Sequence, residues 1–298
     1  MINKTIYQIF HKGSRTMFYS SLFFPKKIRQ DVFICYAFVR RADNLVDSLP
    51  AKPQEFYRFK QHYHQATQGK PTGDIVIDSF ADLEQRKQFD PHWTESFLHS
   101  MELDLTKTSY ETVPELLNYV YGAAEVMGLY MSNILNLPKE AYPAARYLGR
   151  AFQCINALRD INEDNHLGRS YIPLEDLHQF GLHNLTYDHA KQYPNQFTQL
   201  IHTHLTRFYY WLHTAEQGYH FLPKRYLISV KTAMDMYQWT AEQIHRNPFI
   251  VYDWKVKPLI SQIIGSVFLN LIDPIATQKR QNTFNYEPTA IPQIIKTL

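Results

Sequence analysis

The sequence predicts an all-α protein. Apolar residues recur with a helical period along most of the chain, and the apolar–polar alternation typical of half-buried strands is scarce. Only 10 of the 298 residues are glycine, which argues against an α/β nucleotide-binding fold with its glycine-rich turns. The longest helical patterns cover residues 26–48, 115–136, 142–164, 195–219 and 227–246.

A few local signals mark where helices begin and end. Thr112, followed two residues later by proline, predicts a helix start. The stretch 68–73 (QGKPTG) predicts a loop, a break is expected around Pro138, and the pair at 167–168 (LG) predicts the end of a helix. No internal repeat, low-complexity tract or long linker is present, so residues 1–298 are expected to form a single domain.

The composition is that of a globular protein with a sizeable core. Hydrophobic residues make up 45% and charged residues 20% of the chain. A net charge of +3 is too small to indicate nucleic-acid binding. Aromatic residues reach 15%, enough to fill a core and also to line a large apolar cavity.

Two segments bear on membranes. The first 14 residues (MINKTIYQIFHKGS) lack the apolar region of a signal peptide, so a cytoplasmic location is expected. The stretch 259–272 is apolar but short, and it contains two serines, a glutamine and an asparagine, so it cannot span a bilayer. A buried core helix is the first interpretation of this stretch, and peripheral contact with the inner membrane is the alternative.

Two aspartate pairs carry the main functional signal. Asp43 and Asp47 are four residues apart, and so are Asp160 and Asp164. Like charges at this spacing weaken a helix by a few tenths of a kcal/mol. Facing carboxylate pairs can hold Mg²⁺, which shares its remaining positions with water and substrate phosphates. The sequence therefore predicts a site for metal ions and a diphosphate.

Chance alone does not explain where the pairs lie. The 28 acidic residues would produce roughly two or three such pairs at random. At about 100° per residue, however, the first pair continues the apolar stripe that contains Tyr36, and Arg40 lies beside it. The second pair continues a stripe through Gln153 and Asn156. Both pairs are therefore expected to face the interior, where polar groups need partners.

A stripe of small residues has two interpretations. Tyr121, Ala124 and Gly128 share one face of the helix after Thr112. The small side chains can allow close packing of helices, or they can leave room for a hydrocarbon tail. Spacing alone does not separate these interpretations.

At these residues the chain resembles the squalene/phytoene synthase family, with detail similar to its bacterial phytoene synthases. The resemblance covers most of the chain. It is carried by SRTMFYSSLFFP, YAFVRRADNLVDS, SMELDLTKTSYET, NYVYGAAEVMGLY and LGRAFQCINALRDINEDNHLGRSYIP. It implies an isoprenoid-synthase-type helical bundle around a central cavity.

The resemblance also implies roles for individual residues. Mg²⁺ ions bridging to diphosphate would be held by Asp43, Asp47, Asp160 and Asp164. Positions near the diphosphates are matched by Ser14, Arg40, Gln153, Asn156 and Arg159. Aromatic positions facing the reaction zone are matched by Tyr36, Tyr171 and Tyr237. The hydrocarbon chains would contact Met17, Tyr121, Ala124 and Gly128.

Several of these roles have a simpler alternative. Ser14 could be only a helix cap. Arg159 could form an ion pair with Glu163, four residues on. Tyr237 could be a core tyrosine. The chain also departs from the family at Asn44, where an acid is frequent, and at Met17, where phenylalanine is frequent, and this leaves the substrate length open.

The activity that the resemblance implies is head-to-head coupling of two prenyl diphosphates. The first expectation is phytoene synthesis from geranylgeranyl diphosphate with Mg²⁺, or with Mn²⁺ in its place. The alternative is dehydrosqualene or squalene synthesis from farnesyl diphosphate, with NADPH required only for squalene. A non-catalytic assembly factor of the same fold is disfavoured by the intact aspartate pairs and Arg40, and a class I terpene cyclase fits the RDINED and GRSYIP segments poorly.

Overall fold

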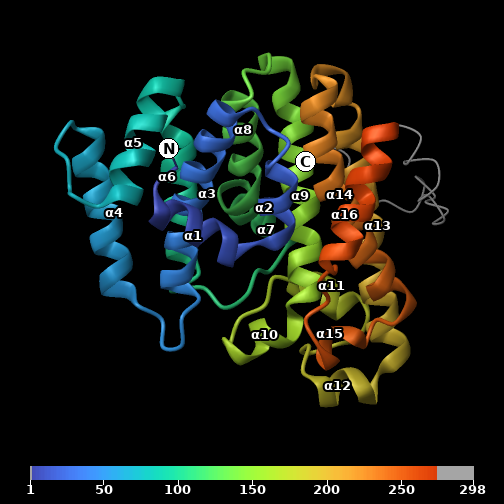
Figure 1. Cartoon of the computed structure of the whole chain (residues 1–298). Helices are drawn as coiled ribbons and strands as arrows, with labels where there is room; N and C mark the ends of the chain where they lie inside the picture. Colours follow the sequence, from blue (N-terminus) through green and yellow to red (C-terminus); the bar gives the residue numbers. More distant parts are fainter. Residues whose placement is uncertain (1, 274–298) are drawn as a thin grey trace.

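The computed structural model describes residues 2–273, and within this range the secondary structure is helical. The first half of the chain forms α1 (Lys4–Gly13), α2 (Arg15–Ser21), α3 (Lys26–Val46), α4 (Pro53–Thr67), α5 (Ile75–Lys87), α6 (Pro91–Leu103), α7 (Val113–Val120), the π-helical turn η1 (Tyr121–Glu125) and α8 (Val126–Ile134). These elements confirm the predicted all-α class. Figure 1 shows α4, α5 and α6 at one side of the bundle and α3 and α8 near its middle.

The second half of the chain completes the bundle. It forms η2 (Lys139–Ala141), α9 (Tyr142–Arg159), α10 (Ile161–His166), α11 (Leu174–Gln179), α12 (Tyr187–Gln192), α13 (Pro194–Glu216), η3 (Tyr219–Phe221), α14 (Lys224–Arg246), α15 (Ile250–Asp253) and α16 (Ile260–Ile272). Long helices α13 and α14 and the shorter α16 lie at the opposite side from α4 (Figure 1).

Most of the predicted boundaries are confirmed. Thr112 caps α7 by accepting a hydrogen bond from the backbone N–H of Glu115. The loop at 68–73 separates α4 from α5, and Gly69 and Gly73 both adopt positive φ there. The predicted helix 115–136 is interrupted because η1 adds a π-helical turn, a distortion frequent at functional sites.

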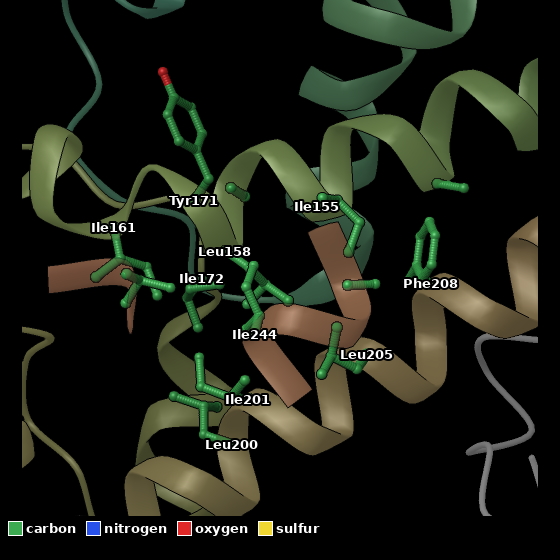
Figure 2. Packing of buried hydrophobic residues seen from close by; sticks show 14 of the residues in the cluster. Ile155, Leu158, Ile161, Tyr171, Ile172, Leu200, Ile201, Leu205, Phe208 and Ile244 are labelled. Atoms are coloured by element: carbon green, nitrogen blue, oxygen red, sulfur yellow. The ribbon is translucent and has the colours of Figure 1, made fainter. Parts of the chain in front are cut away.

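Two clusters of buried side chains form the core. One is built around α3, α5, α6 and α8, and the other around α9, α13 and α14. Ala123, in η1, packs against both clusters. Figure 2 shows the second cluster, in which Ile155 and Leu158 of α9 face Ile201 and Leu205 of α13. The two clusters therefore meet at η1.

Close packing accounts for much of the small-residue stripe. A Cβ on Gly128 would lie 2.1 Å from the carbonyl oxygen of Ala145 in α9. A Cβ on Gly149 would lie 2.4 Å from the carbonyl oxygen of Ala124. The backbones of η1 and α8 therefore touch the backbone of α9 where they cross it. Only glycine, which has no Cβ, fits at Gly128 and Gly149. A hydrocarbon-lining role for Ala124 and Gly128 stays a prediction.

We expect Gly128→Ala to lower the free energy of unfolding by about 1–3 kcal/mol, because the added methyl group meets backbone that cannot move aside. Gly265→Ala is the matched control, since a Cβ there meets nothing within 4 Å. In a helix interior this control substitution should be neutral or stabilise by about 0.5–1 kcal/mol. Urea unfolding of both variants measures the difference, and equal effects would contradict the close crossing.

Candidate active site

The first aspartate pair closes α3. Asp43 lies in the last turn, and Asp47 is the C-cap residue, whose backbone N–H donates to the carbonyl of Asp43 at 3.0 Å. Arg40 Nη1 donates to Asp43 Oδ2 at 2.6 Å. The helix therefore continues far enough to hold both carboxylates on one side, as the spacing predicted.

The second pair lies at a helix break that the sequence did not reveal. The predicted helix over 142–164 ends at Arg159, and Asp160 has φ −100° and ψ 12° before α10 begins. Arg159 holds Asp160 with two hydrogen bonds, of 2.8 and 2.6 Å. The alternative ion pair between Arg159 and Glu163 is wrong, because Glu163 pairs with Lys255. Asp164 remains one turn from Asp160 through a backbone hydrogen bond of 2.8 Å.

Arg169 joins the two pairs. Its Nη2 donates to Asp47 Oδ1 at 2.5 Å, and its Nε donates to Asp164 Oδ1 at 3.4 Å. Gly168, with φ +71°, turns the chain after α10, and the Arg169 N–H then bonds the carbonyl of Asp164 at 3.0 Å. Carboxylates 117 positions apart in sequence are therefore linked by one guanidinium. The sequence predicted a site at each pair and did not identify Arg169.

A fifth carboxylate, Asp104, completes the cluster. Tyr171 donates its hydroxyl hydrogen to Asp104 Oδ1 at 2.6 Å, and Tyr119 donates to Oδ2 at 3.1 Å. The guanidinium of Arg169 lies 5.3 Å from the centre of the Tyr171 ring. Figure 2 shows the Tyr171 hydroxyl pointing away from the aliphatic side chains of the cluster around Leu158. Asp104 was missed, although it sits in SMELDLTKTSYET, because it stands alone without a partner at helical spacing.

Burial and mutual repulsion raise the pKa of three of these carboxyls. Burial first, and then the charge of Asp47, raises the pKa of Asp43 to about 7. Burial, with Asp160 and Asp47 adding to it, raises the pKa of Asp164 to about 7 despite Arg169. Burial raises the pKa of Asp104 to about 6. The cluster therefore holds more negative charge than its surroundings stabilise.

Asp160 behaves differently from its neighbours. Burial acts to raise its pKa, but the hydrogen bonds and charge of Arg159 outweigh burial, and the pKa falls below its ordinary value. Lys255, whose Nζ lies 3.2 Å from Asp160 Oδ1, adds to this effect. Lys255 follows α15, far along the sequence, and no local pattern marked it as part of the site.

Two of the predicted tyrosines, Tyr36 and Tyr237, each lie beside one aspartate pair. Tyr36 stacks on Phe10, with ring centroids 4.0 Å apart, and the Ser14 side chain lies within hydrogen-bonding reach of its hydroxyl. Tyr237, on α14, stacks on Phe152 at 3.9 Å with the rings 9° from parallel. Burial raises the pKa of the Tyr36 and Tyr237 hydroxyls, so both stay protonated. Their charge interactions with Arg40 and Arg159 place one tyrosine beside each pair.

The remaining predicted residues fall into two neighbourhoods. Asn156 donates to Gln153 Oε1 at 3.4 Å. Ser14 caps α2 by accepting from the Met17 N–H at 3.3 Å, so it is a helix cap as well as a neighbour of Tyr36. Tyr121 lies under the guanidinium of Arg146, at 5.1 Å, which is a different neighbourhood from the aspartates.

The acidic cluster fits a hard divalent cation by its chemistry. Across residues 2–273, no three His, Cys, Asp or Glu side chains stand close enough to hold a metal ion as they are arranged. The carboxylates of both pairs are instead engaged with Arg40, Arg159 and Arg169. Carboxylate oxygens are nevertheless the ligands that Mg²⁺ prefers, and the raised pKa values of Asp43 and Asp164 show that added positive charge would be stabilising.

Comparison with known proteins identifies similar sequences. The family model for squalene/phytoene synthase matches residues 10–262. The 15-cis-phytoene synthase of Pantoea ananas is 28% identical over 187 residues, 59% of this chain and 60% of that protein. The phytoene synthase of Thermus thermophilus is 32% identical over 185 residues, 60% and 62% of the two chains. The matched part therefore spans about three fifths of these relatives.

Solved structures show the same fold. A squalene synthase HpnC from Alicyclobacillus acidocaldarius superposes with a TM-score of 0.73 at 21% identity, covering 82% of this chain and 93% of that one. A dehydrosqualene synthase superposes with a TM-score of 0.74 at 20% identity, covering 91% and 95%. The predicted isoprenoid-synthase-type bundle is confirmed.

We expect Asp43→Asn to raise the free energy of unfolding of the metal-free protein at pH 8 by at least about 1 kcal/mol, the value of roughly one pKa unit. A carboxyl with a raised pKa binds its proton more tightly in the folded state. Its contribution to stability is therefore present at low pH and is lost as pH rises through about 7. Urea unfolding in EDTA at pH 5 and pH 8 measures this, and the difference between variant and wild type should shrink at pH 5.

The control for this experiment is Asp82→Asn, at a side chain that is 62% exposed. It should change stability little at either pH. If Asp43→Asn lowers the free energy of unfolding at pH 8, the claim that ionised Asp43 destabilises the folded protein is contradicted.

Proposed function

This chain belongs to the squalene/phytoene synthase family, and from that premise we propose that it is a prenyltransferase that joins two geranylgeranyl diphosphates head to head to form phytoene. The observation that carries the proposal is the convergence of both aspartate pairs through Arg169. The names of the relatives favour phytoene as the product. The pathway would be carotenoid biosynthesis, and the location cytoplasmic with peripheral contact to the inner membrane.

The diphosphates would be bound by the cations that now hold the carboxylates. Arg40, Arg159 and Arg169 each present a planar fork of donors that suits phosphate oxygens. Lys255 adds a point charge beside Asp160. Because these cations are partly buried, their attraction for a polyanion is screened less than at an open surface.

Ionisation of the first substrate breaks its C1–O bond, and the electron pair leaves with the diphosphate. Arginine donors stabilise the charge that develops on the leaving oxygen, and stabilisation of this kind can be worth several kcal/mol. Magnesium ions held by Asp43, Asp47, Asp160 and Asp164 would neutralise the same charge, with manganese as a substitute. The allylic cation adds to the double bond of the second substrate, and proton loss closes a cyclopropylcarbinyl diphosphate.

A second ionisation and rearrangement lead to the 1–1′ linked chain, and loss of a proton ends the reaction. The cations need faces of aromatic rings and exclusion of water. Tyr36 beside Arg40 and Tyr237 beside Arg159 would supply these rings, and each is backed by a stacked phenylalanine. Tyr171 is held by Asp104 and positions its ring beneath Arg169.

Purified protein should convert geranylgeranyl diphosphate to phytoene in Mg²⁺ without NADPH. The alternative, dehydrosqualene or squalene from farnesyl diphosphate, is tested in parallel with and without NADPH. Hydrocarbon products are identified by chromatography and mass spectrometry. If the protein consumes neither substrate, the proposed prenyltransferase activity is refuted and a non-catalytic role is favoured.

Asp160→Asn should lower turnover by at least about 100-fold, because it removes a carboxylate that would hold the Mg²⁺ ions neutralising the leaving diphosphate. Far-UV circular dichroism should show unchanged helix content, since the amide keeps the size of the side chain. Asp82→Asn, the same chemical change at an exposed position, is the control for activity. Wild-type rates in Asp160→Asn would refute the assigned role.

A further inference from the structure

The last described helix, α16, turns its apolar side chains outward. Side chains of Ile264, Phe268 and Leu271 are 52%, 66% and 46% exposed, and those of Leu259 and Ile272 are 67% and 77% exposed. The run from 258 to 272 contains no charged residue. The outward side chains form one face, defined here as the α16 face by the residues Leu259, Ile260, Ile264, Phe268, Leu271 and Ile272. The expectation of a buried core helix at 259–272 is therefore wrong for this face.

Polar residues of α16 point inward, the reverse of an ordinary surface helix. Ser266 donates to Asp235 Oδ2 at 2.6 Å, and Asn270 donates to the same atom at 2.8 Å. Asp235 is also paired with Lys231, and all four side chains are buried beneath α16. Rotating the helix to bury the apolar face would remove the two hydrogen bonds that α16 donates to the buried Asp235 carboxylate, which is costly. The outward orientation is thus fixed by α14.

Exposed basic residues lie on the elements next to α16. Lys257 precedes it, and exposed Trp254 lies just upstream at 54% exposure. The two helices that pack against α16 are α2 and α14, and their exposed ends carry Arg15, Lys224 and Arg225. Two acidic residues also flank this segment in sequence: Asp273 follows the helix, and exposed Asp253 precedes Trp254. An apolar face with tryptophan and basic residues at its edge is the pattern of helices that lie in a bilayer interface.

The helix is too short to cross a bilayer. Thirteen residues span about 20 Å, against about 30 Å of hydrocarbon. Within residues 2–273, no helix is long and apolar enough to cross a membrane.

We propose that the α16 face docks this protein on the surface of an anionic lipid bilayer, with the helix axis parallel to the membrane. The outward apolar side chains enter the boundary between headgroups and acyl chains. Lys257, Lys224 and Arg225 meet the anionic headgroups.

The face is connected to the candidate site through its two supporting helices. Helix α14 carries Tyr237 on its other side, and α2 begins after Ser14, beside Tyr36. Resting on the proposed function, docking through α16 would place the site next to the phase that dissolves prenyl chains and their hydrocarbon product. The docking itself follows from the surface and does not require catalysis.

Flotation with vesicles tests the proposal. The full chain should float with vesicles of phosphatidylcholine and phosphatidylglycerol at 7:3, and bind pure phosphatidylcholine more weakly. The triple variant Ile264→Ser, Phe268→Ser, Leu271→Ser should lose at least about tenfold in bound fraction. A matched triple variant, Tyr57→Ser, Ile75→Ser, Tyr187→Ser, removes side chains that are 45%, 42% and 46% exposed on other elements and should bind as wild type.

Separate measurements distinguish the other outcomes. Circular dichroism should show both triple variants folded, and turnover of detergent-dispersed substrate should be unchanged, so loss of docking is distinct from loss of catalysis. Equal flotation of the α16 variant and wild type would overturn the proposal. A wild-type protein that stays in solution as a monomer would also overturn it and would favour residues 274–298 as the segment that covers the α16 face. A wild-type dimer that the α16 substitutions convert to monomer would overturn it in favour of a second copy of the chain.

Discussion

Five carboxylates drawn into one interior region are the constraint on which the rest of this structure depends. Burial first, and repulsion from neighbouring aspartates second, raise the pKa of Asp43 and of Asp164 to about 7 despite the cations nearby. Arg169 prevents the two halves from separating because it binds one carboxylate from each aspartate pair. The site is thus held together by a cation that a polyanionic substrate would compete for.

Features around the cluster follow from this requirement. The break at Asp160 lets Arg159 fold back onto its neighbour, and the left-handed turn at Gly168 sends Arg169 towards α3. The close crossing of η1 and α8 over α9 fixes the position of the helix that ends at the second pair. The raised pKa values of Asp43 and Asp164 mean that the folded protein loses stability when these two carboxyls ionise.

Sequence patterns predicted a large part of the site, and the reasons for success and failure are specific. The two aspartate pairs were found because both members of each lie within one helical turn, which is a local relation. Asp104, Arg169 and Lys255 were missed because their partners are distant in sequence: Asp104 pairs with Tyr171, and Lys255 reaches Asp160. The break at Asp160 was invisible because apolar periodicity continues across it. For 259–272 the sequence favoured a buried core helix over a membrane-contacting one, because a buried ion pair on another helix decides which side of α16 turns in.

The sequence by itself determined the helical class, the positions of the loops and the inward stripe that carries each aspartate pair, because these depend on residues within a turn or two of one another. Tertiary structure alone decided that Arg169 lies between the two pairs, that Asp104 and Lys255 join them, and that α16 exposes its apolar side. These outcomes depend on interactions between segments that are distant in sequence. Asp47 and Arg169, for example, are 122 positions apart, and no local pattern contains such a pairing.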